Sequence, residues 1–159
     1  LLCPFKLGLI QTWQEEKKPM KFNTLRVGLT GVAQVVVGDE NAADHFAPDM
    51  VPAFATPMLL SLMDNAAHEA VKNHLPEGYV SVGTRLSISH VAATPKGMQV
   101  TARATLVEIH RNRLIFEAEA FDEVEKVGEG RLERFVVNRD SFLKKLESKL
   151  DFIKGLTTE

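Results

Sequence analysis

TPMLLSLMDNAAHEAVKNHL, residues 56–75, is the stretch that decides the fold. Its apolar side chains recur at the three- and four-residue spacing of one helix face, which predicts an amphipathic helix. The helix is expected to begin at Thr56-Pro57, because threonine is a good N-cap and proline suits the first helical position. Pro76-Glu77-Gly78 ends it. The sequence therefore predicts one long helix with a face that must be buried.

The segments around this helix are rich in β-branched residues and are separated by turn residues, which predicts strands. One strand precedes the helix and four follow it, at 25–37, 79–93, 98–109, 114–122 and 127–137. The links between the last four are too short for parallel crossovers, so these strands form an antiparallel meander. The segment between 38 and 55 is predicted to be a loop, and Asp140 opens a short C-terminal helix.

This order of elements defines an α+β class in which an antiparallel sheet covers a single helix. Such a sheet leaves edge strands, and edge-to-edge dimerisation is a common way to cover them. The length of 159 residues fits one domain. Met20-Lys21-Phe22 resembles a natural beginning, so residues 1–19 are expected to be a flexible or non-native extension and residues 20–159 the domain.

The composition of the chain excludes several classes of function. The 19 Lys and Arg residues are balanced by 21 Asp and Glu residues, which argues against a nucleic-acid partner. Cys3 is the only cysteine, so disulfide frameworks, thiolate zinc sites and CxxC redox centres are excluded. The histidines lack a metal-binding spacing such as HExxH, and no metal is expected. No run of about 18 apolar residues is present, so no membrane partner is expected and a cytoplasmic location is the default.

Strict alternation along 79–93 places His90 on the same strand face as Thr84, Leu86 and Ile88, with Gly83 on the opposite face. A hydrogen-bonded core histidine is the commoner explanation for such a residue. The functional explanation is a desolvated imidazole that acts as an acid, a base or an orienting group.

Asp64 lies within the apolar helix. It is either a surface carboxylate paired with His68, or it faces the sheet, where His90 or a hydroxyl must meet its charge. Thr56 is explained as an N-cap, but a hydroxyl there also stands where a developing oxyanion is stabilised. Gly83 weakens a strand unless another backbone or a ligand approaches closely. Three basic side chains could meet phosphates, although solvated surface charges explain them more simply: Lys96, Arg131 and Arg134.

Several motifs together resemble the hotdog-fold acyl-CoA thioesterases of the fluoroacetyl-CoA thioesterase type. They are Phe54-Ala55-Thr56-Pro57-Met58, Leu62-Met63-Asp64, Val82-Gly83-Thr84 and Ser89-His90-Val91-Ala92-Ala93-Thr94-Pro95. The likeness covers about Leu25 to Asn138, and a Thr, an acid, a Gly and a His fall at offsets 0, +8, +27 and +34 from Thr56.

The resemblance implies a hotdog homodimer with active sites at the subunit interface, and hydrolysis of an acyl-CoA thioester. It implies that Thr56, Asp64 and His90 are the catalytic group and that Gly83 supplies a backbone contact near the thioester carbonyl. The other expected substrate-binding residues are Met50, Phe54 and Arg134. No cofactor is implied, since coenzyme A is part of the substrate. Whether the dimer pairs further into a dimer of dimers is left open.

Two positions depart from the family pattern. The family acid is Glu, and Asp64 is one methylene shorter, which favours an Asp64 that positions a water with His90 over direct attack on the acyl carbon. A gating Phe of the specialist enzyme aligns with Met50. A short or branched acyl group is therefore expected in place of fluoroacetate.

Two alternatives stand beside this reading. Gly38-Asp39-Glu40-Asn41 with His45 is similar to the Gly-Asp-x-Asn-Pro-x-His signature of hotdog enoyl-CoA hydratases, but its spacing is one residue too long and the Pro is missing. The second alternative is a CoA-binding or structural dimer that has lost turnover. It is suggested by Asp64, which stands where the fluoroacetyl enzyme has Glu.

Overall fold

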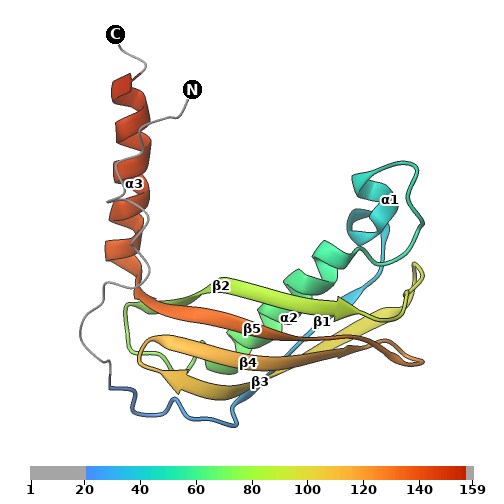
Figure 1. The fold of residues 1–159 in the computed structure, drawn as a ribbon, viewed down its shortest axis with the longest axis horizontal. Coiled ribbons are helices and arrows are strands. Elements are labelled where there is room, and N and C mark those ends of the chain that lie inside the picture. The colour runs from blue at the N-terminus through green and yellow to red at the C-terminus, as the bar shows by residue number, and fades with distance from the viewer. Residues whose placement is uncertain (1–20, 157–159) are drawn as a thin grey trace.

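Helix α2, Thr56–Val71, runs across one face of a five-stranded antiparallel sheet in the computed structural model (Figure 1). The structure describes residues 21–156, so the predicted extension, residues 1–19, lies outside the described residues. The strand order is β1-β3-β4-β5-β2. The strands are β1 (Thr30–Val36), β2 (Tyr79–His90), β3 (Gln99–His110), β4 (Arg113–Phe121) and β5 (Lys126–Asn138). This is the predicted α+β arrangement of one helix covered by an antiparallel sheet.

The differences from the predicted elements are local. β1 is shorter than the predicted 25–37, and α2 ends before 75. The predicted loop contains a short 3-10 helix, η1 (Asp39–Asn41), and one helical turn, α1 (Ala43–Phe46). The C-terminal helix was expected to be short, but α3 runs over 18 residues, Arg139–Leu156.

The core lies between α2 and the inner face of the sheet. The apolar stripe of α2 is buried there: Leu59, Leu62, Met63, Ala66, Ala67, Ala70 and Val71. Gly31 of β1 lets the helix approach closely, because a Cβ at this position would lie 2.2 Å from the carbonyl oxygen of Ala66 and 2.3 Å from the amide of Ala70. No larger residue fits at 31 without moving α2 off the sheet.

A β-bulge in β2 decides which of its residues face the helix. The pairing with β5 shifts between Gly83 and Arg85, so Thr84 is the extra residue. A Cβ on Gly83 would lie 3.2 Å from both carboxylate oxygens of Asp64, so Gly83 faces α2. Leu86 and Ile88, beyond the bulge, also pack against the core. The predicted alternation, which put Gly83 on the opposite face of the strand from Leu86 and Ile88, is therefore wrong. The inserted Thr84 shifts the alternation by one residue, so that all three face the core.

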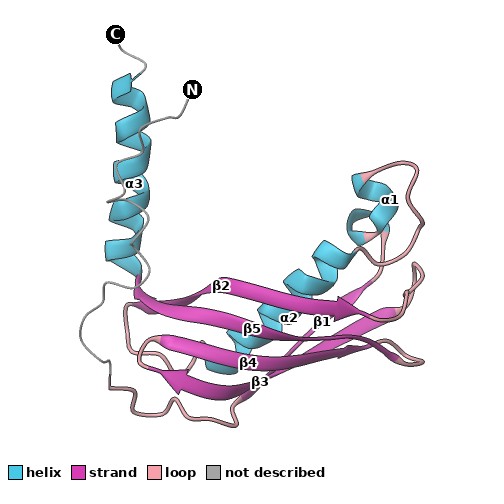
Figure 2. Ribbon diagram, viewed as in Figure 1, coloured by secondary structure: helices cyan, strands magenta, loops and turns pink. Residues whose placement is uncertain are grey.

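The sheet has two edges, β1 and β2. Within the described residues β2 pairs only with β5, which leaves the backbone groups along its other side without a strand neighbour. Figures 1 and 2 show α3 leaving the end of β5 and rising past the β2 edge, away from the other strands.

Candidate active site

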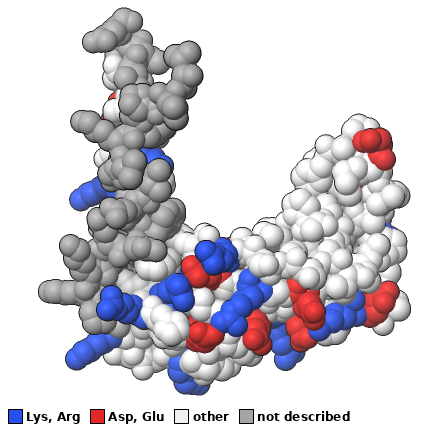
Figure 3. Space-filling view, in the orientation of Figure 1, with Lys and Arg blue, Asp and Glu red and all other residues white. Residues whose placement is uncertain are grey.

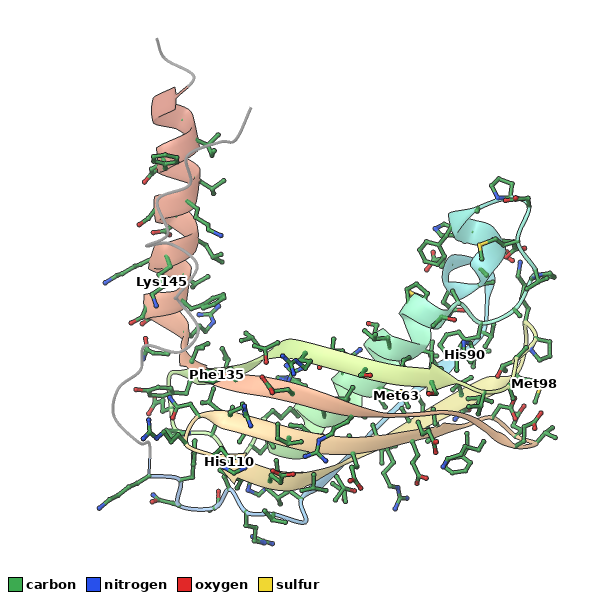
Figure 4. All side chains as sticks on the ribbon, in the orientation of Figure 1. Met63, His90, Met98, His110, Phe135 and Lys145 are labelled. Carbon is green, nitrogen blue, oxygen red and sulfur yellow. The ribbon has the colours of Figure 1, made fainter. Side chains whose placement is uncertain are left out.

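Thr56 and His90 form a hydrogen-bonded pair where α2 begins and β2 ends, with 2.8 Å between Thr56 Oγ1 and His90 Nδ1 (Figure 4 labels His90). The predicted N-cap role of Thr56 is wrong. Ala55 is the N-cap residue, Thr56 is the first helical residue, and no side chain caps this helix end. The threonine hydroxyl is bonded to the imidazole instead, and Thr56 remains exposed.

Burial lowers the pKa of His90 below the ordinary histidine value, while the backbone of Ala92 acts in the opposite direction. The ring is therefore neutral near pH 7 and is able to accept a proton. Its Nε2 atom is buried. An incoming molecule can therefore reach the ring through the exposed hydroxyl of Thr56, which is bonded to Nδ1.

Asp64 faces the sheet and meets an arginine, where a histidine or a hydroxyl had been expected. Its carboxylate forms an ion pair with Arg134 of β5 and lies against Gly83 of β2. The guanidinium of Arg134 also donates to Ser81, from Nε to the hydroxyl at 3.0 Å and from Nη2 to the carbonyl oxygen at 2.8 Å. The side chain of Arg134 is 7% exposed and that of Asp64 26%. Asp64 is thus an anion held in a fixed position at the rim of the core.

The solvated-charge explanation is wrong for Arg134 but holds for Arg131. Arg131 lies three residues earlier on β5 with its side chain 54% exposed, and it pairs with Glu108 and Glu117. Figure 3 shows such acidic and basic side chains intermingled over the sheet. Ser81 was missed as a binding partner, although a serine in a strand that also carries the apolar core is a signal for a buried polar partner.

The predicted catalytic residues fall into two groups within one chain. Thr56 and His90 form the first, and Asp64, Gly83 and Arg134 form the second. Asp64 lies eight positions after Thr56 in α2, about 12 Å along the helix axis at about 1.5 Å per residue. His90 and Gly83 are separated in the same direction along β2. Within one chain, the predicted catalytic residues therefore do not form a single group.

Met50 and Phe54, the other predicted substrate-binding residues, precede Thr56 in the chain and differ in exposure. Phe54 is 3% exposed, belongs to the core cluster and donates its amide to the carbonyl oxygen of Thr94 at 2.8 Å. Met50 lies on the loop after α1 and is 53% exposed. Lys96 ties this region to the turn before β3 by ion pairs with Asp39 and Asp44, at 3.0 and 2.8 Å.

An open groove of about 700 Å³ lies away from both groups. Ser87, Ser89, Arg103 and Arg131 are among its lining residues, which include none of the predicted site residues. Between residues 21 and 156, no three His, Cys, Asp or Glu side chains gather in a way that would hold a metal ion. None of the helices in that range is both long and apolar enough to cross a membrane.

Known thioesterases are similar to this chain in sequence and in fold. A family model described as fluoroacetyl-CoA-specific thioesterase matches residues 37–140. The fluoroacetyl-CoA thioesterase of Streptantibioticus cattleyicolor is 32% identical over 131 residues, which cover 79% of this chain and 94% of that protein. A solved structure of the fluoroacetyl-CoA-specific thioesterase matches with a TM-score of 0.74 and 32% identity, over 80% of this chain and 98% of that one. A hot-dog-like protein from Thermanaerovibrio acidaminovorans matches with a TM-score of 0.72 and 27% identity, over 79% and 93% of the two chains.

The curled antiparallel sheet around α2 and these matches define a hotdog-fold thioesterase, which confirms the predicted fold. The chain belongs to the fluoroacetyl-CoA-specific thioesterase family, as its motifs had indicated. Its enzyme class is therefore that of a thioester hydrolase.

Proposed function

We propose that this protein hydrolyses a short or branched acyl-CoA to the free acid and CoA, in sites that two copies of the chain build together. The observation that carries the proposal is the separation of the two groups of predicted catalytic residues, which we call half-sites. Thr56 with His90 and Asp64 with Arg134 and Gly83 lie towards opposite ends of the edge strand β2. A two-fold axis across β2 brings each half-site to the other half-site of the partner.

The faces of β2 set the register of this pairing. Side chains of directly opposed residues in an antiparallel pair lie on the same face. Gly83, Ile88 and His90 lie on the inner face, so an axis close to Ser87 places His90 opposite the partner's Gly83, with the bulge at Thr84 taking up the extra residue. The partner's Asp64, which contacts Gly83, then faces His90 and Thr56. The dimer holds two such sites and has a continuous ten-stranded sheet.

The residues of one composite site divide the chemistry of thioester hydrolysis. The partner's Asp64 orients a water for attack on the carbonyl carbon. As the oxygen–carbon bond forms, the water gives its proton to Thr56 Oγ1, while the hydroxyl proton of Thr56 passes to His90 Nδ1. Pro57 has no N–H, and the amides of Met58 and Leu59 donate to the carbonyl oxygen of Ala55. The amide of Thr56 and the backbone beside the partner's Gly83 therefore stabilise the oxyanion. The carbon–sulfur bond then breaks, and the CoA thiolate takes the proton from His90. No cofactor is needed.

Two features support an ordinary acyl group over fluoroacetate. The carboxylate of Asp64 is held by Arg134 and has a shorter reach than Glu, which suits a water-mediated attack. Met50 is flexible and apolar, and it stands on an exposed loop at the position that aligns with the gating Phe of the specialist fluoroacetyl enzyme. We propose short straight and branched acyl groups as the substrates.

The test is thiol release from a panel of acyl-CoAs, including acetyl-, propionyl-, isobutyryl- and fluoroacetyl-CoA. Asp64→Asn and His90→Ala should each slow turnover by at least roughly a hundredfold without unfolding the protein. Folded variants with unchanged turnover on a good substrate would remove both residues from the mechanism.

Mixed dimers test the shared site directly. A dimer of one Asp64→Asn chain and one His90→Ala chain carries one site with both changes and one site with neither. Purified mixed dimers should therefore recover about half of the wild-type turnover, although both parent dimers are nearly inactive. If each chain held a complete site, the mixed dimer would stay as inactive as its parents.

The hydratase alternative has little structural support. The side-chain amide of Asn41 is used within its own turn, accepting from the amide of Gly38 at 2.8 Å and donating to the carbonyl oxygen of Val36 at 3.1 Å. Loss of enoate absorbance from crotonyl-CoA without thiol release would favour a hydratase. Tight CoA binding with neither reaction would favour a dimer without turnover.

A further inference from the structure

Helix α3 carries an exposed apolar stripe. Leu143, Leu146 and Leu150 follow one another at spacings of three and four residues and are 40%, 46% and 61% exposed. The helix has 18 residues and is about 27 Å long. Most helical stability in proteins comes from tertiary packing of an apolar face, so three large exposed leucines on one face of α3 favour a covering surface.

A second exposed apolar surface lies at the opposite end of the sheet. It consists of Val36, Val91, Phe121 and Val124, at the ends of β1, β2 and β4 and in the β4–β5 turn, and we call it the strand-end patch. These side chains are 57%, 56%, 43% and 78% exposed. Val36 and Val91 stand at the two edge strands, and Phe121 and Val124 lie between them, so the four form a row of exposed apolar groups along the strand ends.

The two surfaces cannot meet within one chain. α3 begins where β5 ends, at Asn138, whereas Val124 lies just before β5 begins at Lys126. The 13 residues of β5 span about 40 Å, at about 3.3 Å per residue. Only a second copy can bring the stripe of α3 to a strand-end patch.

The dimer described under Proposed function, on which this inference rests, brings them together. Tyr79 pairs with Asn138, the residue before α3, and the two-fold axis near Ser87 places Tyr79 opposite the partner's Thr94. α3 rises past the β2 edge (Figure 1), which is the side that the partner's strands occupy. Those strands follow one another at about 4.8 Å, so a helix of about 27 Å runs along the ends of all five.

Charge complementarity supports the same contact. α3 carries Arg139 and four lysines against three acidic residues, a net charge of +2. The turn that ends in Val124 and Glu125 also holds Asp122 and Glu123, so the patch has an apolar tip within an acidic turn. The lysines of α3 complement the acidic residues of that turn, and its leucine stripe complements the apolar tip.

We propose that α3 of each subunit lies across the strand ends of its partner, with Leu146 and Leu150 covering the partner's Phe121 and Val124. The contact extends the dimer interface beyond the β2 edge. It places a helix of one chain beside the end of the partner's β2, next to the partner's His90.

Cysteine cross-linking of the full-length chain tests the proposal. The variant combines Leu146→Cys and Val124→Cys with Cys3→Ser, and mild oxidation should join most chains into covalent dimers. The matched control replaces Val124→Cys by His110→Cys, because His110 is also exposed but lies at the other end of the sheet (Figure 4). The control and each single-cysteine variant should cross-link at least tenfold more slowly.

A third variant separates failure of this contact from failure of the dimer. Ser87→Cys with Cys3→Ser should cross-link to itself across the two-fold axis. If Ser87→Cys cross-links and the 146–124 pair does not, the α3 contact is wrong and the dimer stands. If neither cross-links and sedimentation shows a monomer, the proposed dimer fails as well. In a chain that keeps Cys3, an intrachain disulfide between Cys3 and the cysteine at 146 would show that the N-terminal segment covers the stripe, which overturns the proposal.

Discussion

Replacement of Arg134 by leucine is the sharpest test of how Asp64 is held. The side chain of Arg134 is 7% exposed, donates twice to Ser81 and forms the ion pair with Asp64. Arg134→Leu removes the guanidinium and with it the two hydrogen bonds to Ser81. It also leaves the carboxylate of Asp64 without its counter-charge at the rim of the core. Leucine fills much of the same space, so lost packing contributes little.

The expected cost follows from the burial of both partners. Breaking a buried ion pair by removing one partner costs about 3–5 kcal/mol. The 26% exposure of Asp64 lets water screen part of its charge, so we expect the lower end, about 3 kcal/mol. For a chain of this length that corresponds to a fall in Tm of about 6–12 °C. Turnover should fall as well, because an unheld Asp64 no longer orients the water.

Arg131→Leu is the matched control, since it changes the same residue type on the same strand. Arg131 is 54% exposed, and its pairs with Glu108 and Glu117 should contribute at most about 1 kcal/mol. Both variants are compared by thermal unfolding at one protein concentration, because the Tm of any dimer depends on concentration.

A second substitution checks the cause of the loss. Arg134→Leu combined with Asp64→Leu should regain part of the lost stability, because an apolar pair replaces a broken ion pair at little cost. Equal losses of stability for Arg134→Leu and Arg131→Leu would refute the reasoning, and so would a double variant less stable than Arg134→Leu alone.

Two further predictions concern the composite site. Burial lowers the pKa of His90 in the free protein, so kcat/KM should fall only as the pH drops through a value below about 6.5, where the ring becomes protonated and no longer accepts a proton. The pH profile of kcat/KM for thiol release measures this, and an acid limb above 6.5 would contradict it. Gly83→Ala places a Cβ 3.2 Å from both oxygens of Asp64, so the carboxylate must move by a few tenths of an ångström and kcat should fall about three- to tenfold. Gly38→Ala is its control, since a Cβ at position 38 meets nothing within 4 Å, and equal kcat for the two variants would dissociate Gly83 from the site.

The elements and their order were predictable from the sequence because the signals for them are local. The apolar spacing of residues 56–71, the proline at the helix start and the short turns between strands each act over a few residues. They were sufficient for one helix, five strands and an antiparallel sheet. The family motifs then indicated the hotdog class and selected Thr56, Asp64 and His90.

The tertiary structure alone decided the partners of those residues. Thr56 bonds to His90, 34 positions away, and Asp64 pairs with Arg134, 70 positions away. Periodicity cannot reveal either contact, because it reports which face a residue occupies and not what lies opposite.

The bulge at Thr84 is the clearest case of this limit. One inserted residue turned Gly83 towards Asp64 and reversed the predicted faces of β2. The propensities of Thr84 do not mark a bulge, because its position is set by the pairing with β5. Local chemistry therefore determined which elements form. Long-range packing determined that Thr56 lies with His90 and that Asp64 lies with Arg134, as two separate groups within one chain.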